Sequence, residues 1–209
     1  PVVLVAKAGN NAEQHNHNDV GSFVLRIGET TFLCDPGAGL YNAAYFGRER
    51  YENVFAASYG HSVPRIGGMQ QKPGGQYRGT LDVSSDGTAR IDMHEAYGIA
   101  ALKSLQRTFK IEKDGRVTMT DEFRFDGDGL EVEQAFVTWH QVRVNGPAAY
   151  VVGDQGELEI RADSGVFKAE RLEEACKANK KTGLLTRLSV SYPQASTVEA
   201  RVTFVYKKA

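Results

Sequence analysis

Residues 104–125 read Ser-Leu-Gln-Arg-Thr-Phe-Lys-Ile-Glu-Lys-Asp-Gly-Arg-Val-Thr-Met-Thr-Asp-Glu-Phe-Arg-Phe. Two runs in which apolar and polar side chains alternate flank the turn Lys113-Asp114-Gly115. Asp-Gly between alternating runs is the strongest short-range signal for a β-hairpin. This stretch therefore predicts two antiparallel strands, 104–112 and 117–125.

The same pattern extends along most of the chain. Asp-Gly turns recur at Asp86-Gly87, Asp126-Gly127 and Asp128-Gly129. Further strands are expected at 23–27, 31–33, 77–83, 88–93, 130–139, 149–152, 158–161, 184–192 and 198–206. Roughly twelve closely spaced strands predict an all-β fold, a large antiparallel β-sandwich with little helix.

Helix is expected only in two weak candidates, residues 167–178 and 48–55. There is no internal repeat, linker or low-complexity tract. One domain over residues 1–209 is the simplest organisation.

The composition excludes several classes of function. The chain has 209 residues, a net charge of −1 and a pI near 6.6. It therefore lacks the basic character of a nucleic-acid-binding protein. No apolar run approaches the roughly 20 residues that a membrane-spanning helix needs. Two cysteines, Cys34 and Cys176, are too few for a disulfide scaffold. The chain begins at Pro1 and not at Met, so we expect a segment of a longer protein.

The residues that carry chemistry lie between residues 9 and 70. His15 and His17 are two apart, and on an extended strand they would share a face. Strands 20–27 and 30–34 would form a hairpin that returns Asp35 close to His17. With His61, these residues offer imidazole and carboxylate ligands that suit zinc and several other divalent ions.

The motif His-Asn-His-Asn-Asp-Val-Gly-Ser-Phe at 15–23, followed by Asp35-Pro36-Gly37, Tyr41 and His61, resembles the signature of the heparinase II/III-like family. The resemblance is specific over residues 9–70 and only architectural over residues 71–209. In that family an N-terminal α/α toroid domain precedes a β-sandwich domain. The resemblance implies that this chain is the sandwich domain without the toroid.

The resemblance also implies residue roles. His15 corresponds to the catalytic histidine of the family, and His17, Asp35 and His61 correspond to the ligands of a metal, commonly zinc, that is expected to be structural. The family usually has Asn directly after the third ligand, whereas this chain has Ser62. Ser62 offers different hydrogen bonds from Asn, so the orientation of His61 is expected to differ from that in the family.

The family cleaves uronic-acid-containing polysaccharides, such as heparin, heparan sulfate or alginate, by β-elimination. His15 could act as base, as acid or as a donor to the substrate carboxylate. Because the toroid domain supplies the remaining catalytic groups, the resemblance implies that this chain alone is inactive. It also implies an acidic polysaccharide and the toroid domain as partners, and a periplasmic or secreted bacterial location.

Four further residues could contact substrate: Asn10, Asn11, Arg48 and Arg50. The asparagines lie in a loop sequence, and arginines more often lie on a solvated face. Asp19 either supports the two histidines by a hydrogen bond or caps a helix or turn.

Two other functions fit parts of the pattern. A cupin-like metal enzyme also uses His-x-His, but it needs a Glu where this chain has Gly21 and Ser22. A non-catalytic carbohydrate-binding or interdomain module would present exposed aromatic side chains, and the single tryptophan, Trp139, is expected in the core.

Overall fold

The computed structural model describes all residues 1–209 and contains sixteen strands and one short α-helix. Every pair of neighbouring strands is antiparallel, which confirms the predicted all-β sandwich. The five further strands are either two or three residues long or contain no buried side chain.

The larger layer is a nine-stranded sheet with the order β11-β12-β13-β16-β9-β8-β7-β6-β2. Its strands in chain order are β2 Gly9–Asn11, β6 Gly74–Val83, β7 Ala89–Asp92, β8 Leu102–Ile111, β9 Val117–Phe125, β11 Gln141–Asn145, β12 Ala148–Gly153, β13 Gly156–Ala162 and β16 Thr197–Lys208.

Two smaller sheets complete the fold. One has the order β14-β15-β10-β5 and the other β1-β3-β4. Their strands are β1 Val2–Ala6, β3 Phe23–Ile27, β4 Thr30–Leu33, β5 Arg65–Ile66, β10 Leu130–Thr138, β14 Lys168–Arg171 and β15 Thr186–Ala195.

Phe23 joins the three sheets in one core of 32 buried residues. Its ring centroid lies 4.9 Å from that of Phe109 and 5.8 Å from that of Phe204, both in the nine-stranded sheet. The ring of Phe136, in β10, is 6.3 Å away. Burial of this much aromatic surface is the main stabilising contribution to such a fold.

The Asp-Gly turns divide into two kinds. Asp86-Gly87 and Asp114-Gly115 lie in the hairpins β6–β7 and β8–β9, as predicted. The pairs at 126–127 and 128–129 connect β9 to β10, which belong to different sheets. The expected hairpin there is wrong, because this turn carries the chain from one layer of the sandwich to the other.

The helical candidates are only partly realised. In residues 167–178, strand β14 precedes helix α1, which covers only Glu173–Ala178. In residues 48–55 a single 3-10 turn, η1, spans Arg50–Glu52. The chain has two more 3-10 turns, η2 Ser58–Gly60 and η3 His94–Ala96.

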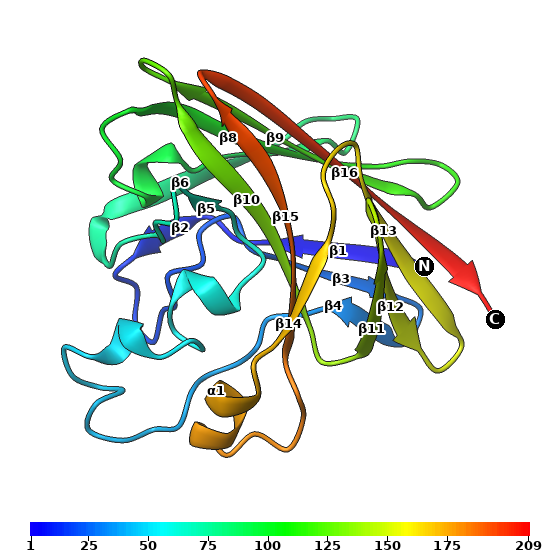
Figure 1. The fold of residues 1–209 in the computed structure, drawn as a ribbon, viewed down its shortest axis with the longest axis horizontal. Coiled ribbons are helices and arrows are strands. Elements are labelled where there is room, and N and C mark those ends of the chain that lie inside the picture. Colours follow the sequence, from blue (N-terminus) through cyan, green and yellow to red (C-terminus); the bar gives the residue numbers. More distant parts are fainter.

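Long loops gather at one end of the sandwich. In Figure 1, the blue-to-cyan segment after β4 runs past α1 at the opposite end of the molecule from both termini. No helix is long and apolar enough to span a membrane. The loop end, supported by the rigid sheets, is where the predicted site residues lie.

Candidate functional site

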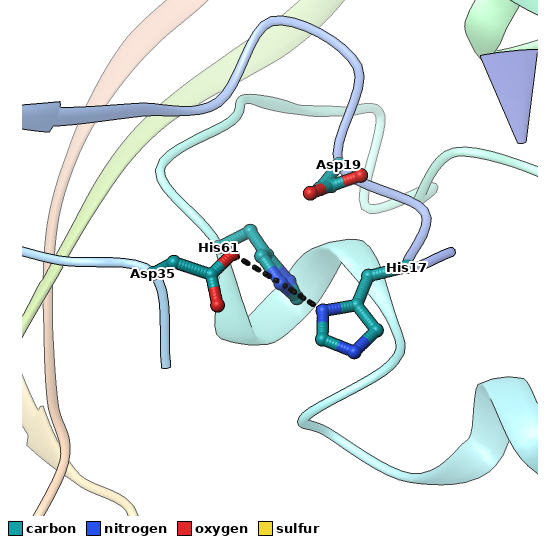
Figure 2. A group of neighbouring side chains, drawn as sticks. All are labelled: His17, Asp19, Asp35 and His61. Carbon is teal, nitrogen blue, oxygen red and sulfur yellow. Dashed lines mark hydrogen bonds and ion pairs between the residues drawn. The ribbon is translucent and has the colours of Figure 1, made fainter. Parts of the chain in front are cut away.

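Four side chains from three loops converge at this end: His17, Asp19, Asp35 and His61. The atoms that each could offer to a metal ion all lie within 4.8 Å of one another. Figure 2 shows the two imidazoles facing each other, with the two carboxylates beside them. The β3–β4 hairpin accounts for part of this, since β4 ends at Leu33, two residues before Asp35, and so returns the chain towards His17.

The local conformation around His15 differs from the expected strand. Residues 12–22 form turns and loop, and β3 begins only at Phe23. His15 has a φ of +57°, is exposed, and does not belong to the four-residue cluster. A left-handed conformation is uncommon for residues other than glycine, and such strain concentrates at functional sites.

His61 is fully buried, and both of its ring nitrogens are committed. Nδ1 lies 2.9 Å from the carbonyl oxygen of Ala57 and therefore carries the hydrogen. Nε2 points into the cluster, 3.1 Å from Nδ1 of His17 and 3.7 Å from Oδ2 of Asp35. A histidine whose second nitrogen donates to a carbonyl is the usual arrangement of a metal-binding imidazole.

His17 is held by a tyrosine on its other side. Nε2 of His17 lies 3.2 Å from Oη of Tyr45. Burial, followed by the neighbouring His61, lowers the pKa of His17 to about 4. The imidazole is therefore neutral near pH 7, which is the form that binds a metal.

The two carboxylates lie in different surroundings. Asp19 is 5% exposed and forms an ion pair with Lys7. The side chain of Asp35 is 46% exposed, and its Oδ1 accepts a hydrogen bond from the Gly37 amide at 2.7 Å. Two imidazole nitrogens and two carboxylates fit a divalent cation well. Asp19, expected from the sequence only as a cap or a supporting residue, therefore belongs to the cluster, and its position two residues after His17 is the signal for this in the sequence.

The candidate sugar-contacting residues have different environments. Asn11 is 1% exposed, and its side-chain amide donates to the carbonyl oxygen of Lys72 at 3.0 Å, so it holds the segment around Lys72 in place. Arg50 donates to the carbonyl oxygens of Asn16 and Tyr45, at 2.8 and 3.2 Å. These contacts hold the loop of His15 and His17 against Tyr45.

The remaining two candidates are more open to solvent. Arg48 is exposed. Asn10 is partly buried, and its Oδ1 accepts from the Ala12 amide at 2.9 Å. Of the four, Arg48 has the side chain best placed to meet an anionic ligand.

An exposed aromatic group lies beside the cluster. Tyr41 and Phe46 are 57% and 59% exposed, and their ring centroids are 5.0 Å apart. The ring of Tyr45, which contacts His17, is stacked on Tyr41 at 5.3 Å. The sequence pattern does not single out Phe46.

Cys34 and Trp139 belong to the structure beneath the site. Trp139 stacks on Phe55, with centroids 6.2 Å apart. Cys34 and Cys176 are both free and buried. Burial raises the pKa of Cys34 to about 12, so this thiol stays protonated and unreactive at neutral pH.

Residues 1–197 match the family model described as "Heparinase II/III-like, C-terminal". No curated protein matches the chain at a significant level.

Several solved structures share the fold. The heparan sulfate lyase HepC from Pedobacter heparinus superposes with a TM-score of 0.75 at 16% identity, covering 100% of this chain and 33% of that one. A structure described as the heparinase III BT4657 gene product gives a TM-score of 0.74 at 12% identity, covering 99% of this chain and 32% of that one. The chain thus spans about a third of the length of the solved structures that it matches.

Proposed function

This chain belongs to the heparinase II/III-like family of C-terminal domains, and we propose that it forms the metal-binding half of the active site of a polysaccharide lyase. In this proposal the metal is bound by His17, Asp35 and His61, and His15 is the catalytic histidine. The remainder of the active site comes from an N-terminal α/α toroid domain.

The observation that carries the proposal is the convergence of four side chains that could bind a metal ion. They come from positions 17, 19, 35 and 61, and three loops must fold together to bring them within 4.8 Å. His15, two residues before the first of them, is exposed and held in a left-handed conformation. A fixed cluster beside an exposed, strained histidine suits a site that acts on an external substrate.

The reaction we propose is β-elimination from a uronic-acid-containing polysaccharide of the heparin, heparan sulfate or alginate type. A proton leaves the carbon next to the uronate carboxylate, and the bond to the neighbouring glycosidic oxygen then breaks. The reaction needs a base, an acid for the departing oxygen and neutralisation of the carboxylate. His15 can fill one of these roles, and groups of the toroid domain fill the others.

Zinc is the metal we propose, because two imidazoles and one or two carboxylates are ligands it accepts readily. When bound, the ion would supply positive charge that holds the three loops together. His17 follows His15 closely in the chain, so fixing His17 also limits the movement of His15. The role of the metal is thus structural, and the chemistry rests with His15.

The aromatic surface and Arg48 are proposed to meet the substrate. The exposed rings of Tyr41 and Phe46 can stack on sugar rings, and Arg48 can pair with carboxylate or sulfate. The same surface would serve the alternative function, a carbohydrate-binding module without catalysis. Binding of an acidic oligosaccharide that persists in His15→Ala but is lost in a Tyr41→Ser, Phe46→Ser variant would favour that alternative.

Metal analysis tests the cluster directly. We expect about one equivalent of zinc in the purified chain, and its loss in His17→Ala and in Asp35→Ala. His94→Ala is the matched control, because His94 lies outside the cluster and contacts Asp92 instead. A folded chain that takes up no zinc after reloading would contradict the metal site.

Activity tests the division of labour between domains. We expect no cleavage of heparan sulfate or alginate by this chain alone, and cleavage by a protein that also contains the toroid domain. The unsaturated uronate product absorbs in the ultraviolet and gives the readout. Loss of activity in His15→Ala with zinc retained supports the catalytic role, whereas full activity in that variant refutes it. We also propose a periplasmic or secreted location, which fits an extracellular polysaccharide substrate.

A further inference from the structure

A single arginine in the core bonds to two of the loops that form the cluster. Arg107 lies in β8 and is fully buried. One of its terminal nitrogens, Nη1, donates to the carbonyl oxygens of Gly21 and Ser62, at 2.8 and 2.7 Å. Gly21 follows Asp19 by two residues, and Ser62 comes directly after His61.

The other donors of this arginine are fixed from the sheets. Nε and Nη2 donate to the two carboxylate oxygens of Asp121, at 2.8 and 2.7 Å. Nη2 also donates to Oε1 of Gln134 at 3.1 Å. All five N–H groups therefore donate hydrogen bonds. The guanidinium group is held by β9 of the nine-stranded sheet and β10 of the four-stranded sheet as well as by the two loop carbonyls.

A buried ion pair is a poor source of stability, because removing both charges from water costs about as much as their attraction returns. An apolar pair would serve the core of a sandwich equally well. The specific result of placing Arg107 here is that two loop carbonyls are tied to one rigid group. Neither carbonyl bonds to a neighbouring strand, so the sheet ladders do not fix them.

Gln71 adds a second connection between the same loops. Its side chain accepts from Val20 N at 3.0 Å and donates to Val20 O at 2.7 Å, as a neighbouring strand would. The backbone amide of Gln71 donates to Oγ of Ser58 at 3.1 Å. The loop of His17 and the loop of His61 are thus joined on their core side by Arg107 and by Gln71.

We propose that Arg107 is a positioning residue for the metal site, which sets the separation between the loop carrying His17 and Asp19 and the loop carrying His61. This inference rests on the proposed metal site. Arg107 touches neither the metal ligands nor the substrate surface, and it acts only through the Gly21 and Ser62 carbonyls.

Arg107→Lys is the direct test. Lysine keeps the positive charge beside Asp121, but its single ammonium group cannot serve that carboxylate and both carbonyls. We expect zinc affinity, measured by competition with a chromophoric chelator, to fall about 10- to 100-fold, as is typical for loss of a supporting partner. The visible spectrum of the cobalt-substituted site should also change.

Leu105→Ala is the matched control. Leu105 is two residues earlier in β8, on the same inward face and fully buried. Its truncation weakens the core without touching either loop carbonyl. Similar losses of zinc affinity in both variants, or parental affinity and cobalt spectrum in Arg107→Lys, would overturn the proposal.

Hydrogen exchange of the metal-free chain separates failure of this inference from failure of the metal site. If the parent binds no metal, the metal site fails, and the loop-positioning role is still tested. Arg107→Lys should then raise exchange in residues 17–22 and 58–63 more than Leu105→Ala does, and equal exchange would refute the role. If Arg107→Lys does not fold, the side-chain NMR signals of Arg107 in the parent should shift on zinc addition, and unchanged signals would refute it.

Discussion

Nδ1 of His17 lies 3.1 Å from Nε2 of His61, so a hydrogen bond joins the two rings. Nδ1 of His61 already donates to the Ala57 carbonyl, which leaves its Nε2 as the acceptor. His17 therefore carries its hydrogen on Nδ1 in the metal-free chain. Its Nε2 accepts in turn from the hydroxyl of Tyr45, at 3.2 Å.

A change of tautomer in His17 is the first prediction. A metal bound at Nδ1 of His17 displaces that hydrogen, which then resides on Nε2 and is donated to Tyr45. We expect nitrogen-15 NMR to show His17 protonated at Nδ1 without metal and at Nε2 with zinc, while His61 keeps its tautomer. His17 remaining protonated at Nδ1 in the zinc-loaded chain would contradict this arrangement.

The low pKa of His17 predicts a dependence of stability on pH in the metal-free chain. The ring is neutral in the folded state above about pH 4, whereas the unfolded chain takes up a proton below its ordinary value of 6.5. Stability from this residue is therefore complete above pH 6.5 and declines as the pH falls towards 4. Between these pH values the contribution of His17 to the free energy of unfolding changes by at most about 1.4 kcal/mol per pH unit. Solvent contact of the partly exposed ring makes this change smaller.

Urea unfolding of chelator-treated protein between neutral and acid pH measures this effect. His17→Gln cannot take up the proton, so its free energy of unfolding should vary less over the same interval. Parallel curves for the parent and the variant would show that another group controls the acid sensitivity.

Gly21 is predicted to tolerate no side chain. Its φ is +89°, and an added Cβ would lie 2.1 Å from Sδ of Met93. The free energy of unfolding of Gly21→Ala should fall by more than the roughly 1–3 kcal/mol that a strained backbone costs. The zinc affinity of the variant should also fall. Gly87→Ala is the control, since Gly87 has a φ of +81° but no atom within 4 Å of the added carbon. Equal loss of thermal stability in the two variants would rule out the steric contribution.

Asn179 is predicted to hold the loop that carries Tyr45. Its Oδ1 accepts from the Leu40 amide and from Nδ2 of Asn53, both at 2.8 Å. Asn179→Ala leaves both donors without this partner and should cost about 1–3 kcal/mol. Hydrogen exchange at Leu40 should rise sharply.

Asn179→Asp keeps the acceptor oxygen and should retain most of the protection at Leu40. If Asn179→Ala leaves the exchange of residues 38–46 unchanged, the loop is held by other contacts. Lys181, which donates to Ala38 O at 2.5 Å, would be the next residue to test.

The strands and much of the cluster follow from local patterns in the sequence. The alternation in residues 104–125 predicted two strands and their hairpin, and the β3–β4 hairpin correctly returned Asp35 towards His17. The turn from β9 to β10 was misread, because an Asp-Gly pair has the same local chemistry within a hairpin as between two sheets. Only the packing of the layers distinguishes the two.

The sequence around Arg107 and Asp121 contains a signal for their pairing. Arg107 lies between the buried Leu105 and Phe109, at the inward positions of β8, and Asp121 occupies the equivalent place in β9. A charged residue at an apolar position of one strand predicts a partner on another, although it does not say which loops the pair will reach. Tyr45 carried no such signal, since its loop has no periodicity and its contact with His17 arises only in the folded chain.

The connection through Arg107 also sets an order of assembly during synthesis. The ribosome makes the residues that carry the imidazoles and carboxylates first, and Arg107, Asp121 and Gln134 follow only later, at about 5–20 residues per second. Until β8, β9 and β10 have emerged and paired, the early loops have no anchor for their carbonyls. If the cluster binds a metal, the nascent chain should therefore take it up late, after the nine-stranded and four-stranded sheets have packed on each other.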